Sequence, residues 1–247
     1  MKAELNLLPG VSEDYVRMRL SAAGGKEIET GKFSSPESSA ALAVNGFAWF
    51  HERPNSIPIL PGTDYAGWPA ISVEVESCCR FPWSGGKHPW LDAAIETRTH
   101  LLGVESKRHE PFRDAKKAVL SKAYDRPKWG TSMGPFERMR DLLRSKSLQF
   151  KHLDAAQLVK HAFGLVTEGK RRGKKPVLFY LHAEPSVRRK EDINRHREEV
   201  ADFGQAVKGA EVTFASATWR EWLDSWEVKN PPDLKLHQEL LIKRFEL

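Results

Sequence analysis

Two apolar segments of strand length, residues 91–97 and 101–107, are separated by very little chain. Parallel strands need a crossover of a dozen or more residues, so segments this close can pair only as an antiparallel hairpin. Arg98 and Thr99 occupy the turn of that hairpin. Residues 71–76 alternate between apolar and polar side chains, and this pattern predicts a strand just before the hairpin.

Three charged side chains fall at the open end of the predicted hairpin. With the turn at Arg98 and Thr99, Asp92 lies opposite Glu105, where facing side chains are roughly 5 Å apart. Lys107 is two residues beyond Glu105 and therefore points to the same face of the strand. The register thus predicts two carboxylates and one ammonium on a single surface.

Two interpretations of this charged group are open. Asp92 and Glu105 would repel each other if they were unpaired, and Mg²⁺ or Mn²⁺ would relieve that repulsion through oxygen ligands. Such a metal can bind a phosphoryl oxygen and activate a water, while Lys107 stabilises developing negative charge. Alternatively, the hairpin lies at an exposed edge and the three residues are ordinary surface charges.

The remaining patterns predict a mixed α/β domain. Ser35 is suited to cap a helix, and Pro36 is suited to its first position. The continuous apolar run 176–182 is typical of a central strand. Further helices are expected over 112–124, 135–147, 152–167, 189–208, 219–226 and 234–245, and a further strand over 211–216.

The expected fold class is a mixed β-sheet with helices on both faces. No stretch of the sequence divides the chain convincingly, so residues 1–247 are expected to form a single domain. Within it, about residues 1–52 form a helical N-terminal extension with the first core helix. About residues 219–247 form a helical C-terminal tail.

Composition excludes few classes of protein. Hydrophobic residues make up 40% of the chain and charged residues 29%, as in ordinary soluble proteins. The sequence has neither a membrane-length apolar run nor a secretory signal at its start, so we expect a cytoplasmic protein without membrane contact. The two cysteines, Cys78 and Cys79, are neighbours and have no further ligands at zinc-binding spacing.

The formal net charge of +6 favours polyanionic partners, although weakly. Two basic runs flank the 176–182 strand and are dense enough to follow a phosphate backbone. Each run taken alone is equally explained as a solvated loop. The candidate nucleic-acid-binding residues are Arg171, Arg172, Lys174, Lys175, Arg188 and Arg189.

The chain resembles the PD-(D/E)XK nucleases, which have the restriction-endonuclease-like fold. Pro89, Asp92 and the tripeptide Glu105-Ser106-Lys107 match the motif, with Trp90 and Leu91 as extra residues between the proline and the first acid. The resemblance extends to the apolar helix at 36–50, to the helix that includes residues 154–157 and to the strand at 176–182.

The resemblance implies roles for individual residues. Asp92, Glu105 and the backbone carbonyl of Ser106 would bind the metal, and Lys107 would be the catalytic lysine. Many members add an acid from the first helix, which Glu37 could supply unless it only complements the helix dipole. Gln157 matches a glutamine that some members place near the site.

Two further residues have open alternatives. Glu76 ends the strand before the hairpin and either adds a metal ligand or pairs with Arg80. His88 either touches phosphate or is a loop histidine. The sequence therefore predicts a Mg²⁺- or Mn²⁺-dependent nuclease acting on DNA. RNA as substrate, a homodimer, and an inactive DNA-binding or scaffold protein with the same fold remain open.

Overall fold

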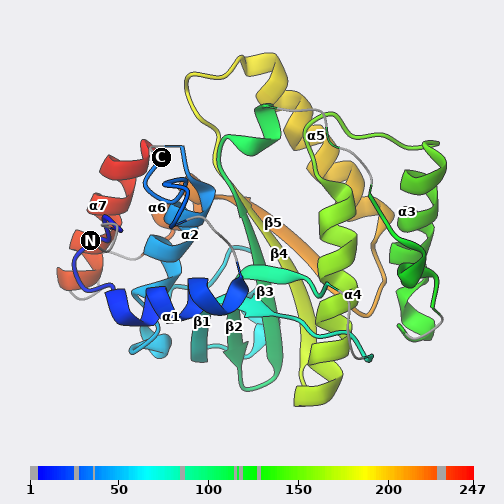
Figure 1. Cartoon of the computed structure of the whole chain (residues 1–247), viewed down its shortest axis with the longest axis horizontal. Coiled ribbons are helices and arrows are strands. Elements are labelled where there is room, and N and C mark those ends of the chain that lie inside the picture. Colours follow the sequence, from blue (N-terminus) through cyan, green and yellow to red (C-terminus); the bar gives the residue numbers. More distant parts are fainter. Residues whose placement is uncertain are drawn as a thin grey trace.

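The computed structural model describes residues 5–24, 28–35, 37–83, 87–113, 116, 119–126, 129–226 and 232–247. One five-stranded sheet crosses this part of the chain in the order β1-β2-β3-β4-β5 (Figure 1). The strands are β1 (Ala70–Cys78), β2 (Trp90–Thr97), β3 (His100–Lys107), β4 (Lys175–His182) and β5 (Thr213–Thr218). The first three are antiparallel, and β4 and β5 continue parallel to β3. The expected mixed sheet is confirmed.

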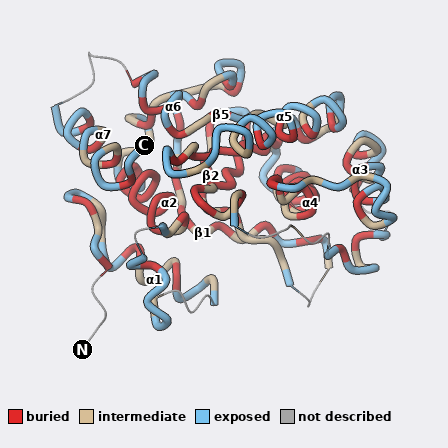
Figure 2. Tube along the Cα trace, turned by 90° about the horizontal axis from the view of Figure 1, so that it is seen from above, coloured by how far each residue is buried: buried red, intermediate tan, exposed pale blue. Residues whose placement is uncertain are grey.

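Helices cover both faces of the sheet, as expected. One layer contains α1 (Glu13–Ala23), α2 (Ser39–Ala48), α6 (Trp219–Asp224) and α7 (Pro232–Phe245). The other contains α3 (Gly134–Ser145), α4 (Ala155–Arg172) and α5 (Lys190–Ala206). Figures 1 and 2 show the two layers on opposite sides of the strands. Each layer has its own buried apolar cluster, and the sheet separates the two clusters.

Strand β3 distributes its side chains between these clusters. Leu102 and Val104 belong to the cluster under α2, whereas Leu101 belongs to the one under α4. Since side chains alternate along a strand, Glu105 and Lys107 share the α4 face with Leu101. Ser106 points to the opposite face, where its hydroxyl accepts a hydrogen bond from the Trp219 indole at 3.1 Å.

Two glycines permit close packing beside the hairpin. A Cβ on Gly46 of α2 would lie 2.5 Å from the Trp219 ring, so only glycine leaves room for this tryptophan beneath Ser106. A Cβ on Gly103 of β3 would lie within 2.7 Å of Leu165 on α4. These contacts set the spacing of the helices from β3, and α4 is thereby brought close to Glu105.

Three sequence predictions need correction. Residues 13–23 form α1; a helical N-terminal extension was expected, but the bounds of this helix were not predicted, because few of its positions are apolar. Between 112 and 124 the described residues form only 3-10 turns, at Glu110–Phe112 and Lys122–Asp125, instead of a helix. Helix α2 begins at Ser39 with Ser38 as its cap, in place of Ser35; Pro36 lies outside the described residues.

Within the described ranges, none of the helices combines the length and the apolar character that a membrane crossing requires.

Candidate active site

The β2–β3 hairpin has the predicted register, and its ladder stops where the charged residues begin. The last paired residues are Ala93 and Val104, and the next in line are Asp92 and Glu105. At this point the Asp92 Oδ2 atom accepts a hydrogen bond of 2.6 Å from the backbone N–H of Ser106. A side chain thus replaces the next backbone bond of the ladder and fixes the carboxylate at the open end of the hairpin.

Glu105 is the most shielded acid of the group, with its side chain 2% exposed. One of its oxygens contacts the Lys107 ammonium, and the other lies 2.9 Å from Nε2 of His161 on α4. Burial raises the pKa of Glu105, but Lys107 and His161 lower it more, to about 2. Glu105 is therefore ionised at neutral pH.

Asp92 responds in the opposite direction. Burial, followed by repulsion from the Glu105 carboxylate, raises the pKa of Asp92 well above its usual value, despite the nearby Lys107 ammonium. Burial lowers the pKa of Lys107, but the Glu105 and Asp92 carboxylates raise it by more than burial lowers it. The net shift of the Lys107 pKa is therefore upward. The three groups act on one another: Lys107 favours the ionised form of both acids, and the ionised Glu105 opposes ionisation of Asp92.

A cavity of about 210 Å³ opens over Glu105 and Lys107. Gln157 of α4 and Tyr180 of β4 form part of its wall, and Glu110 and Lys116 lie on the segment that follows β3. The complete set of lining residues is Glu105, Lys107, Glu110, Pro111, Lys116, His152, Asp154, Gln157, Leu158 and Tyr180. Of the three catalytic candidates, Glu105 and Lys107 therefore line a cavity large enough for a phosphate group and water, and Asp92 is not among its lining residues.

Helix α2 reaches this end of the sheet through Ser39. The Ser39 hydroxyl donates to the Glu110 carboxylate and accepts from the Arg108 backbone N–H at 2.9 Å. Burial raises the pKa of Glu110, but the bond from Ser39 and the charge of Lys107 are among the effects that hold it below its usual value. Glu110 is thus a fixed negative charge on the cavity wall.

The start of α4 is held in place by two carboxylates. Asp154 caps the helix, because its side chain accepts a 2.9 Å hydrogen bond from the backbone N–H of Gln157. Glu199 of α5 is buried and accepts from the backbone N–H groups of residues 151–153 at 2.8 to 3.0 Å. These bonds position Gln157 and His161, one helical turn apart, over Glu105.

Three other predicted site residues, Glu37, Glu76 and His88, differ in how near they lie to Asp92, Glu105 and Lys107. Glu37 precedes the α2 cap and pairs with Arg113 on the exposed surface. Glu76 falls opposite Asp92 in the β1–β2 register, has a left-handed φ of 47°, and adds to the repulsion that raises the Asp92 pKa. His88 accepts the Phe81 backbone N–H at 3.1 Å and so closes its loop.

The two basic runs lie at opposite ends of the sheet. Residues 171–175 lie beside the hairpin turn, since Lys175 pairs with His100, whereas the catalytic candidates lie at the other end of β3. Arg172 and Lys174 both form ion pairs with Glu96, and Arg171 bonds Glu168 and the carbonyls of residues 80 and 81.

The second run follows β4 and is at the same end as the candidate site. Arg189 pairs with Asp192, and an Arg188 Nη atom lies 3.5 Å from His109. Nucleic-acid binding by either run stays a prediction, and the ion pairs of the first run account for much of its charge.

Sequence reasoning missed three residues around the site. His161 contacts Glu105, and its spacing of four from Gln157 would have placed it on the same helix face. Glu110 follows Lys107 by three residues but beyond the end of the strand, where alternation no longer predicts direction. Tyr180 lines the cavity from β4, and nothing in its apolar run distinguishes it from core residues.

The donor set suits a hard divalent cation. Among the described residues, no group of three or more His, Cys, Asp or Glu side chains is arranged to hold a metal by itself. Mg²⁺ does not need such a group, because it commonly binds one or two carboxylates and completes its shell with water and phosphate oxygens. Asp92 and Glu105 meet that requirement, and their mutual repulsion is the electrostatic condition that a cation relieves.

The strand order, with its antiparallel hairpin, parallel continuation and two helical layers, is compatible with the restriction-endonuclease-like fold. The chain belongs to the family described as restriction endonuclease associating with ARP, whose model matches residues 2–246. This membership indicates a nuclease-like function. Neither the curated proteins nor the solved structures with which the chain was compared contain a match.

Proposed function

We propose that the chain is a metal-dependent nuclease of the PD-(D/E)XK type that hydrolyses DNA phosphodiester bonds. The observation that carries the proposal is the convergence of Asp92, Glu105 and Lys107 where the hairpin ladder ends. Buried acids that face each other are costly for a protein to keep. Family membership supports the choice of a nuclease over other enzymes that use a metal and two carboxylates.

In the proposed reaction, water attacks the phosphorus atom and the bond to the leaving oxygen breaks. Asp92 and Glu105 would hold Mg²⁺ or Mn²⁺, which when bound supplies charge neutralisation and a more acidic water. The Lys107 ammonium stays protonated and is placed to stabilise negative charge that develops on the phosphate oxygens. His161 orients Glu105 through its 2.9 Å contact.

The test is cleavage of single-stranded DNA and of plasmid DNA in Mg²⁺ or Mn²⁺, with EDTA as the metal-free control. We expect Asp92→Ala and Lys107→Ala each to reduce cleavage at least 10²-fold, on the order of the loss seen when one charge-stabilising group is removed. Glu96→Gln is the matched control, because Glu96 lies on the same strand as Asp92 but near the turn. It should retain activity.

Two results would argue against this assignment. Cleavage that persists in both the Asp92 and Lys107 variants would place the chemistry elsewhere. DNA binding by the wild-type chain without cleavage at millimolar Mn²⁺ would favour the inactive DNA-binding or scaffold protein instead.

A further inference from the structure

A second and larger hollow adjoins the catalytic cavity. Its volume is about 780 Å³, within the range of pockets that enclose ligands of nucleotide size. It lies between the end of α3, the segment 146–153 and the first turn of α4, with Arg195 of α5 at its edge. Lys116 and Asp154 line both hollows, so the two adjoin at these residues, and the smaller one contains Glu105 and Lys107.

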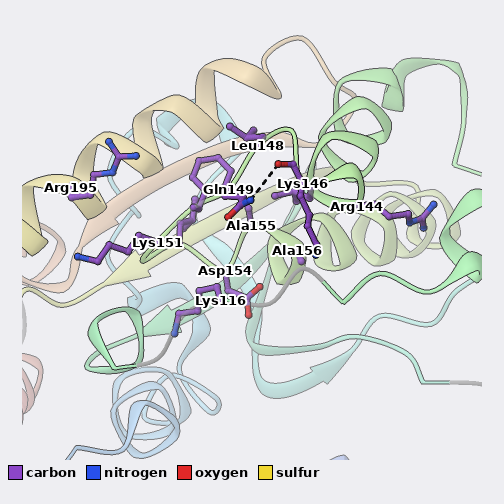
Figure 3. Close-up of a pocket in the computed structure, with 13 residues that line it drawn as sticks. Lys116, Arg144, Lys146, Leu148, Gln149, Lys151, Asp154, Ala155, Ala156 and Arg195 are labelled. Atoms are coloured by element: carbon purple, nitrogen blue, oxygen red, sulfur yellow. Dashed lines mark hydrogen bonds between the residues drawn. The ribbon is translucent and has the colours of Figure 1, made fainter.

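The charge of the larger hollow suits a polyanion. Among its described lining residues, five are cationic and only Asp154 is acidic. Three of these cations also pair with carboxylates outside the lining: Arg144 with Asp125, Lys151 with Asp192 and Arg195 with Glu199. The carboxylate of Asp154 is already engaged as the cap of α4. Figure 3 shows Lys151 and Arg195 on one side of the hollow, Arg144 on the other and Lys116 beside Asp154. The cationic residues are Lys116, Arg144, Lys146, Lys151 and Arg195.

The floor of the hollow is apolar, which a phosphate backbone alone would not need. Leu148 and Phe150 are half-buried and line it together with the buried Leu143 and Leu153. The Phe150 ring packs against Phe203 with ring centroids 6.4 Å apart, and this contact holds it in place. An aromatic ring among cations is the combination that binds unpaired bases, because every base has a stacking face.

The amino end of α4 also opens onto both hollows. This helix spans Ala155–Arg172, and residues of its first turn line each hollow. The positive end of a helix dipole favours bound phosphate. Here the Asp154 carboxylate already caps this end, so the cationic side chains supply most of the attraction for phosphate.

We propose that this hollow binds an unpaired nucleic-acid strand and leads it to the catalytic cavity, so that the substrate is single-stranded at the point of cleavage. The proposal rests on the proposed nuclease function. A base stacks on the apolar floor at Phe150, and phosphates contact the cationic rim. Paired bases in a duplex are stacked on one another and would leave this apolar floor unused.

The test measures binding in EDTA, where cleavage cannot interfere. Fluorescence anisotropy compares labelled oligothymidine, oligouridine and a duplex of the same length. The wild-type chain should bind single strands more tightly than the duplex, and the two single strands distinguish DNA from RNA. Equal or tighter binding of the duplex would overturn the proposal.

Two variants assign the binding to the hollow. Phe150→Leu keeps apolar packing but removes the stacking ring, and should weaken single-strand binding about 10-fold. Lys146→Ala removes a cation that has no acidic partner among the described residues, and should reduce the slope of log K against log salt by about 0.7. Thermal unfolding of each variant shows whether it remains folded.

Lys243→Ala is the control for charge, because Lys243 is also exposed but lies on α7, in the helical layer on the other face of the sheet. It should leave single-strand binding unchanged. Loss of binding in Lys243→Ala, together with normal binding in Lys146→Ala and Phe150→Leu, would overturn the proposal. If the hollow variants lose single-strand binding while the wild-type chain cleaves nothing, this inference stands and the nuclease assignment fails.

Discussion

Asp92 is the residue at which activity and stability are opposed. Burial and the Glu105 carboxylate raise its pKa above the value in the unfolded chain. Between those two pKa values the folded protein binds a proton that the unfolded chain has lost, so stability falls as pH rises through this window. Above this window the protein bears the full electrostatic cost of Asp92.

We accordingly predict that Asp92→Asn stabilises the metal-free protein at neutral pH while it abolishes cleavage. The amide oxygen can still accept the Ser106 N–H, but the repulsion from Glu105 is gone. A gain of about 1 kcal/mol, or roughly 2–4 °C in Tm, is typical when such a site is relieved. Thermal unfolding in EDTA measures it, and a lower Tm than wild type would contradict the account.

Single residues were predictable where the evidence was local. Asp92 and Glu105 are joined by a short hairpin, and the turn alone set their register. The contact between His161 and Glu105 depends on how α4 packs against β3, which no local pattern reports. Gly103 permits the close approach of α4 to β3. This role can be recognised only once the position of Leu165 over Gly103 is known.

At the scale of elements, strands and helices with strong apolar periodicity were predicted within a few residues. The bounds of α1 within the expected helical extension were not predicted, because only Tyr15, Val16 and Leu20 are buried on a largely charged segment. The prediction of a helix over 112–124 was wrong for a different reason. Leu120 and Tyr124 are buried in the core, as the apolar pattern indicated, but they reach it from irregular chain and a 3-10 turn.

Which basic residues lie near the candidate site was the hardest feature to infer from sequence. Both basic runs beside β4 were predicted to bind nucleic acid, but β4 separates them, and only the second run lies at the end of the sheet that carries the site. The hollow beside the active site has no such run, because its cations come from α3, the segment 146–153 and α5. A surface assembled from distant elements leaves no contiguous pattern in the sequence.

At the scale of the molecule, the α4–α5 layer buries histidines that resist protonation. Burial lowers the pKa of His182 to about 4 and that of His196 to about 2. The Tyr180 hydroxyl lies 3.0 Å from His196 Nε2, and burial raises the pKa of Tyr180, so the tyrosine stays protonated and donates this bond. Both rings are therefore neutral parts of the core.

We predict that stability falls as pH drops below about 6.5, the usual histidine pKa in an unfolded chain. Two histidines act in this direction and outweigh Asp92, which alone acts in the opposite direction. The unfolded state then binds protons that the folded state does not, at about 1.4 kcal/mol per pH unit for each histidine. Urea unfolding between pH 7 and pH 4.5 measures the slope. His182→Phe keeps a ring against Tyr180 and should flatten it, and an unchanged slope in that variant would contradict the prediction.

The central claim is that Asp92 and Glu105 share one divalent cation, and calorimetric titration with Mn²⁺ tests it most directly. The wild-type chain and the Glu96→Gln control should bind Mn²⁺ at submillimolar to millimolar concentrations, whereas Asp92→Asn and Glu105→Gln should not. Absence of binding by the wild-type chain at millimolar Mn²⁺, or equal binding by all four proteins, would contradict the claim.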